Sequence, residues 1–161
     1  MFRSKNSRRQ MIFVVMSLMA VFVVGLIAGR RFVNTSSWEL FEFSGANFSE
    51  YVSFETERAD DVISAVLTNV SESNVSHGAA FTLVKLTDEE AGKWRIFPFD
   101  DEVAFVGIEL ALLPGHGVRY TLTEDMLAYR LMAGQYRIVV DFSADGENFM
   151  QAWAGFELLE R

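Results

Sequence analysis

Apolar residues follow two patterns along this chain, one continuous run near the N-terminus and short alternating stretches from residue 51 onward. The continuous run, residues 11–29, is uncharged, and Ser17 is its only hydroxyl residue. A helix of this length is about 28 Å long, close to the ~30 Å hydrocarbon core of a bilayer. Because lipid cannot satisfy backbone polar groups, the run predicts a transmembrane helix. Its anchoring side chains are Met11, Ile12, Phe13, Val14, Val15, Leu18, Val21, Phe22, Val23, Val24, Leu26 and Ile27.

The basic residues on either side of this run predict its orientation. Four bases precede it, at positions 3, 5, 8 and 9, and two follow it, at positions 30 and 31. Positive charge concentrates on the cytoplasmic side of membranes, so we expect a cytoplasmic tail at residues 1–10 and the rest of the chain outside. The alternative is a cleaved signal peptide, whose shorter hydrophobic region ends in small residues. The bulky Leu26 and Ile27 favour an uncleaved signal anchor instead.

The alternating stretches predict β-strands, because a strand that is buried on one face places every second side chain in the core. Turn-forming residues separate these stretches at the spacing of a β-sandwich or barrel. Helical spacing occurs only at residues 124–133, over one or two turns. We therefore expect an all-β sandwich of about seven to eight strands in residues 51–161. The clearest strands lie at residues 51–56, 62–69, 80–86, 93–99, 118–122, 135–143 and 149–159.

The last two strands show the alternation most clearly and also its one interruption. Strand 135–143 directs Tyr136, Ile138, Val140 and Phe142 inward and Arg137 and Asp141 outward. A turn at Asp145 and Gly146 leads into the final strand. There the inward set changes near Gly155, from Phe149 and Trp153 to Phe156 and Leu158, which predicts a β-bulge at that glycine.

Residues 30–50 have no steady period and are expected to form a stalk or linker. Trp38, Phe41 and Phe43 would let this segment lie back on the domain or on the membrane face. Five aromatic residues of the domain allow two interpretations, a stacking face for a carbohydrate or peptide and ordinary core packing. Core packing is favoured, because a small sandwich with this many rings needs most of them inside. These residues are Trp94, Phe97, Phe99, Phe105 and Trp153.

Charge and composition exclude several classes of function. Residues 1–31 carry six bases and no acid, whereas residues 32–161 carry 8 bases against 22 acids, a net charge of 8 − 22 = −14. The folded part therefore has no basic stripe for nucleic acid, and its acidic surface is interpreted as solvated. The chain has no cysteine, which excludes disulfides, thiolate metal sites and a thiol nucleophile.

Candidate chemistry is sparse, and no catalytic, cofactor or metal residue is assigned. His77 and His116 lie between small turn residues and are expected to be exposed loop histidines. No G-x-S-x-G elbow presents a serine, and two isolated histidines are too few for zinc. The acids at 60–61 and 100–102 are interpreted as turn-forming and solubilising, with calcium binding as the alternative. Four N-x-S/T triplets, at Asn34, Asn47, Asn69 and Asn74, are interpreted as turns rather than glycosylation acceptors.

Leu131, Gly134 and Tyr136 predict a tyrosine corner, in which a tyrosine hydroxyl at the start of the penultimate strand bonds an upstream backbone group. That motif follows G-K-W-R-I-F-P at residues 92–98 and L-P-G at residues 113–115. In this order the motifs resemble the bacterial immunoglobulin-like domains of surface and membrane proteins, mostly from Gram-positive bacteria. The resemblance implies a seven-stranded sandwich used for display, spacing or binding, without a shared catalytic site.

These observations predict a single-pass protein of the cell membrane, with a transmembrane helix followed by an extracytoplasmic immunoglobulin-like β-sandwich. We expect a non-catalytic module for binding, adhesion or scaffolding at the cell surface. Its partners would be membrane lipid, through the N-terminal helix, and an unidentified protein or surface ligand, with no nucleic acid. The alternatives are an accessory subunit of a membrane complex and a sensor of an extracellular sugar, peptide or calcium ion.

Overall fold

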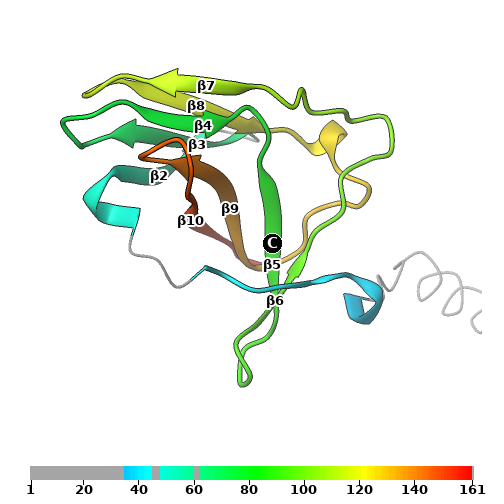
Figure 1. Ribbon diagram of the computed structural model, residues 1–161. Coiled ribbons are helices and arrows are strands. Elements are labelled where there is room, and N and C mark those ends of the chain that lie inside the picture. The colour runs from blue at the N-terminus through cyan, green and yellow to red at the C-terminus, as the bar shows by residue number, and fades with distance from the viewer. Residues whose placement is uncertain (1–34, 45–47, 60–61, 161) are drawn as a thin grey trace, which may run out of the picture. The chain divides into compact units, whose positions relative to one another are not determined.

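The computed structural model describes residues 35–44, 48–59 and 62–160, which fold into two facing β-sheets (Figure 1). Three single-turn 3-10 helices accompany the strands, η1 (Thr35–Ser37), η2 (Phe48–Glu50) and η3 (Glu124–Met126). The tail at 1–10, the predicted transmembrane helix at 11–29 and residues 30–34 lie outside the described residues. Within the described ranges, no helix has both the length and the hydropathy needed to cross a membrane.

The smaller sheet has three antiparallel strands in the order β2-β3-β8. These are β2 (Val52–Ala59), β3 (Val62–Asn69) and β8 (Gly117–Leu122). All three were expected from their alternation. Each follows the period of two because one face is buried in the core and the other meets solvent.

The larger sheet is built around β9 (Gly134–Ser143), which forms a hairpin with β10 (Phe149–Leu158) along its whole length. The other side of β9 is shared by two strands, β5 (Thr82–Asp88) and β4 (Val75–Gly78). Beyond β5 lie β6 (Lys93–Ile96) and then β1 (Leu40–Phe41), while β7 (Glu109–Leu112) lies beyond β4. The described residues thus contain ten strands, more than the seven to eight expected, because β1, β4 and β7 are too short to show a period.

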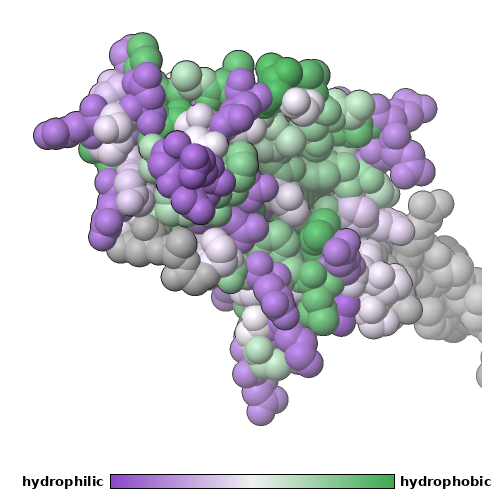
Figure 2. Space-filling model, in the orientation of Figure 1, coloured by the Kyte–Doolittle hydropathy of each residue, from purple (hydrophilic) through white to green (hydrophobic). Residues whose placement is uncertain are grey.

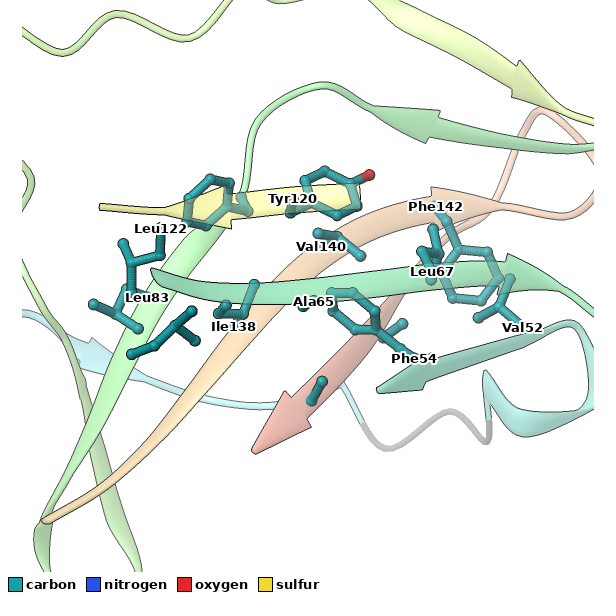
Figure 3. Close-up of a cluster of buried hydrophobic side chains, with 14 of the residues drawn as sticks. Val52, Phe54, Ala65, Leu67, Leu83, Tyr120, Leu122, Ile138, Val140 and Phe142 are labelled. Carbon is teal, nitrogen blue, oxygen red and sulfur yellow. The ribbon is translucent and has the colours of Figure 1, made fainter. Parts of the chain in front are cut away.

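The core lies between the sheets and takes alternate residues from both (Figure 3). Val52, Phe54 and Leu67 of the smaller sheet meet Ile138 and Phe142 of the larger one. The inward set expected for residues 135–143 is confirmed, since Tyr136, Ile138, Val140 and Phe142 are all buried. Burial of these side chains removes apolar surface from water and is the main stabilising contribution of the sandwich.

The last strand forms where it was expected and packs Phe156 and Leu158 against the core, but the predicted bulge and the inward placement of Phe149 and Trp153 are wrong. Pairing between β9 and β10 runs from Phe149 to Leu158 without a shift, so there is no bulge at Gly155. Ala152 and Ala154 are the buried residues, whereas Phe149 is exposed and Trp153 is only half-buried. Trp153 was placed inward because it is large and apolar, but its side chain packs on the outer face of the sheet.

The helix expected at residues 124–133 is reduced to the single turn η3. After that turn the chain is drawn into tertiary contacts. Leu127 forms an isolated bridge with Phe99, and the Ala128 amide donates to the Pro98 carbonyl oxygen (3.2 Å). These bonds replace the i to i+4 ladder, so tertiary contacts outweigh the local helical preference.

Candidate functional site: an aromatic cage on the outer face of the larger sheet

Two buried valines show that the outer face of the larger sheet is covered. Val84 and Val139 are 0% and 3% exposed. Val84 pairs with Arg137, and Val139 pairs with Trp153. Since the neighbours of Arg137 and Val139 along β9 face the core, these four residues face away from the smaller sheet. A second, smaller apolar layer therefore lies on this outer face.

The cover is an aromatic cage formed by Phe43, Trp94 and Trp153 around the guanidinium of Arg137. The Arg137 Cζ atom lies 3.7 Å from the ring centre of Trp153, 4.2 Å from that of Trp94 and 4.8 Å from that of Phe43. The Phe43 ring meets Trp94 and Trp153 edge-on, at 5.7 Å and 5.9 Å between ring centres. Each residue comes from a different segment, so the cage exists only in the folded domain.

The electrostatics of the cage depend on the faces of the rings. Within the described residues, the ion pairs are Lys93 with Asp88 and Arg119 with Glu57, and neither involves Arg137. Burial lowers the pKa of the Arg137 guanidinium, which nevertheless stays charged because arginine ordinarily titrates above pH 12. The negative faces of aromatic rings attract such a cation through cation–π interactions. The cage therefore stabilises a positive charge without a carboxylate.

A strap, residues 38–44, brings Phe43 to the cage. The Ile96 amide donates to the Glu39 carbonyl oxygen (2.9 Å), and the Ser44 amide donates to Gln151 Oε1 on β10 (2.9 Å). Between these bonds β1 pairs with β6, and Figure 1 shows this segment running from η1 past β6. Of the two positions considered for the stalk, the described residues therefore lie on the domain.

The five aromatic residues considered from the sequence divide between two places. Phe97 is buried in the core, and Phe99 and Phe105 pack edge-on against each other and the core (5.1 Å between ring centres). Trp94 and Trp153 form the cage instead. Sequence reasoning placed Arg137 outward but missed its ring partners, because no local signal connects positions 43, 94, 137 and 153.

The expectation for His77 is wrong. This residue is 3% exposed and lies within β4, because residues 75–78 continue the sheet beside β9 instead of forming a loop. Its Nδ1 atom lies 2.8 Å from the Tyr120 hydroxyl, which donates to the Gly78 carbonyl oxygen (2.9 Å). Burial raises the pKa of the Tyr120 hydroxyl. His77 thus connects the two sheets, whereas His116 is exposed in a turn, as expected.

Tyr136 makes the contacts by which a tyrosine corner is recognised. Its hydroxyl donates to the Met132 carbonyl oxygen (2.7 Å) and accepts from the Met132 amide (3.2 Å). Gly134 has φ +142°, a conformation that favours glycine, and Leu131 packs against the core. Burial raises the pKa of the Tyr136 hydroxyl to about 12. That this corner fixes the crossing between the sheets stays a prediction.

The acidic residues and asparagines considered from the sequence stabilise turns, where they lie in described residues. Asp100 Oδ1 accepts the Glu102 amide (3.0 Å), and the described ranges hold no cluster of three or more metal-ligating side chains. Asn69 is fully buried, and its amide donates to the carbonyl oxygens of Ser73 and Leu112, both at 2.8 Å. An amide engaged in this way is closed to a glycan in the folded protein. The acids at 60–61 and the asparagines at 34 and 47 lie outside the described residues.

The match to a family model agrees with the fold. Residues 48–154 match the family described as bacterial Ig-like domain. No curated protein sequence matches the chain. Among solved structures, the chain is similar to a β-glucosidase from Listeria innocua in complex with gluconolactone, with 17% identity and a TM-score of 0.26. That likeness covers 68% of this chain and only 17% of the β-glucosidase. Because the family match spans most of the chain, this chain belongs to the bacterial immunoglobulin-like domains.

Proposed function

We propose that this protein is a non-catalytic, membrane-anchored immunoglobulin-like module that binds or scaffolds a partner at the outer surface of the cell membrane. Two independent features support the proposal. Bacterial Ig-like domains are surface or extracellular modules, and residues 11–29 have the length and composition of a membrane-spanning helix. The basic residues around that run favour an outer location for the domain.

The strap is the observation that carries the proposal. Glu39 and Ser44 are hydrogen-bonded to the larger sheet, so the described part of the expected stalk belongs to the domain, and only residues 30–34 separate it from the apolar run. Five residues span at most roughly 18 Å when fully extended. A domain on so short a tether acts at the membrane surface and meets partners in the same membrane or directly above it.

Protease treatment of intact cells tests this proposal. The full chain carries a tag after residue 161 and is expressed in a bacterium, and its intact mass is measured. We expect the full mass together with loss of the tag when protease is added outside. Removal of about the first 29 residues would show a secreted domain, as a cleaved signal peptide predicts. A protected tag would invert the topology, and either result would overturn the proposal.

A second candidate function is an accessory subunit of a membrane complex, and β7 is the observation that favours it. Within the described residues, β7 pairs only with β4 and is an edge strand. Val106, Ile108 and Leu110 are exposed on and before it, and hydrophobic residues gather along the upper rim of Figure 2, where β7 lies in Figure 1. An unpaired edge with apolar neighbours suits strand addition from a partner.

Two changes show whether a partner is held by the helix or by the β7 edge. Replacing residues 11–29 by an unrelated spanning helix removes any assembly that the helix encodes but leaves binding by the domain intact. Leu110→Lys places a charge on the β7 edge, and Leu113→Lys serves as its control at a similarly exposed turn position. Co-purification that is lost with Leu110→Lys, but kept with Leu113→Lys and with the exchanged helix, would support assembly through the β7 edge.

A further inference from the structure

A row of paired residues crosses the larger sheet near β1. Leu40 pairs with Arg95, Arg95 pairs with Lys85, and Lys85 pairs with Tyr136. Directly paired residues of an antiparallel sheet point to the same side. Since Tyr136 faces the core, the whole row lies on the side of the sheet that carries the smaller sheet.

The smaller sheet does not cover this row to its end. Tyr136 is buried, but Leu40 is 54% exposed. The neighbouring loop, residues 127–133, adds two more exposed apolar residues, Tyr129 and Met132. Tyr129 stacks on Trp38 at 6.0 Å between ring centres, and both backbone groups of Met132 bond to the Tyr136 hydroxyl. Leu40, Tyr129 and Met132 thus border one area, here named the β1-side surface.

Arg95 is half-buried at the β1-side surface, and Lys85 is buried behind it. Lys85 is 9% exposed, its Nζ atom lies 5.2 Å from the ring centre of Tyr136, and burial lowers its pKa. Neither ion pair within the described ranges involves Lys85 or Arg95. The Arg95 guanidinium instead donates to the carbonyl oxygens of Ser36 and Trp38. In an acidic domain the half-buried Arg95 marks a place where negative charge from outside is favourable.

The β1-side surface lies close in sequence to the apolar run, which indicates the membrane as its partner. η1 begins at Thr35, with five residues between it and the end of the apolar run at Gly29, and leads directly into Trp38. Figure 1 shows η1 at the same end of the sandwich as the loop between η3 and β9, in agreement with the ring contact of Trp38 and Tyr129. Rings with a polar edge, and cations on aliphatic stems, are typical of the membrane interface.

We propose that the β1-side surface docks on the headgroup region of the bilayer, with Leu40, Tyr129 and Met132 among the lipid headgroups and Arg95 near lipid phosphates. The inference rests on the membrane anchoring proposed above. It adds a defined orientation, in which the end of the sandwich that carries η1 faces the membrane. The opposite end, with the turns after β3 and β9, then faces away from the lipid.

A fluorophore attached at single positions tests the orientation. The chain has no native cysteine, so one introduced cysteine is labelled without background. Met132→Cys probes the β1-side surface, and Val70→Cys is its matched control, since the two side chains are 52% and 54% exposed. Met132 follows the Leu122 end of β8, whereas Val70 lies near its Gly117 end. The label is nitrobenzoxadiazole, whose emission shifts to the blue in an apolar environment.

The full labelled chain is reconstituted into vesicles of phosphatidylcholine and phosphatidylglycerol, with and without lipids that carry a nitroxide on the headgroup. We expect a blue shift and strong quenching at position 132, and neither at position 70. Adding Leu40→Glu to the Met132→Cys protein should abolish the quenching. Leu113→Glu is its control, because Leu113 is similarly exposed in the turn between β7 and β8.

The two proposals fail in different ways. A protein that floats with the vesicles but shows equal signals at positions 132 and 70 is anchored without docking, which overturns the inference alone. A protein that does not float with the vesicles overturns the anchoring as well. Quenching that survives Leu40→Glu would also contradict the docking surface. Weaker quenching in vesicles of pure phosphatidylcholine would support the role assigned to Arg95.

Discussion

Replacing Arg137 tests whether the aromatic cage holds the strap through the charge of its guanidinium. Arg137→Met keeps the aliphatic stem but removes the charge, so it leaves most of the packing in place. Three rings lie within 4.8 Å of the Cζ atom. A half-buried cation–π contact contributes about 1 kcal/mol, and the three are not fully additive, so we expect a loss of about 2 kcal/mol in the free energy of unfolding. Arg137→Lys should recover part of it, because an ammonium lacks the planar surface that stacks on the rings.

The assay is urea unfolding of the full chain in detergent micelles, followed by tryptophan fluorescence, which reports on Trp94 and Trp153 directly. Arg119→Met is the control, since Arg119 forms an exposed ion pair with Glu57, and such pairs contribute ~1 kcal/mol or less. Added salt should weaken that ion pair and leave the cage largely unchanged. An Arg137→Met protein as stable as the wild type would refute the reasoning and show that the cage is ordinary apolar packing.

Three further predictions concern stability. Asn69→Asp replaces the amide donor by an oxygen that faces the carbonyl oxygens of Ser73 and Leu112. We expect the free energy of unfolding to fall by about 3 kcal/mol, visible as a lower urea midpoint. Asn69→Ser should lower it less. The pKa of the Tyr136 hydroxyl is raised to about 12 in the folded protein, whereas an unfolded tyrosine titrates near ~10. Between these pH values only the folded state keeps the proton. The free energy of unfolding should therefore fall by up to ~1.4 kcal/mol per pH unit as pH rises from about 10 toward 12. Tyr136→Phe should remove this part of the alkaline slope, and an unchanged slope would contradict the assignment. Gly134→Ala adds a Cβ at φ +142° that lies 3.3 Å from Lys85 Cε, and we expect a loss of about 1–3 kcal/mol in the same urea assay.

Most strands were predictable from the sequence, but the inward set of β10 and the short strands β1, β4 and β7 were not. β3 begins and ends where its alternation does, because only Ile63, Ala65 and Leu67 need to be apolar on the core side. β10 was misread because both of its faces are occupied, one by the core and the other by the cage. A large ring such as Trp153 then lies on the outer face, while Ala152 and Ala154 are the most buried residues of the inner one, and the usual link between size and burial is lost.

The candidate site was harder to predict than the fold, for a related reason. Arg137 was placed outward from the pattern of its own strand, but the cage depends on the strap, on β6 and on β10 together. His77 shows the same limit. Its small neighbours indicate a turn, yet pairing with β9 and the hydroxyl of Tyr120 hold it in a strand. Local sequence reports local preference, whereas these positions are decided by segments far away in the chain.

The strap also has a mechanical consequence. Any force that enters the domain through residues before Thr35 reaches the strap first. The contacts that resist it are the Arg95 bonds to Ser36 and Trp38, the two-residue strand β1, a few backbone bonds and the Phe43 edge of the cage. The sandwich, with ten-residue strands β9 and β10 fully paired, is the stronger element. Peeling the strap up to η2 would free residues 35–47, which lengthens the chain by up to roughly 45 Å. The fold thus contains a weak first link that gives way under load while the immunoglobulin-like core stays intact.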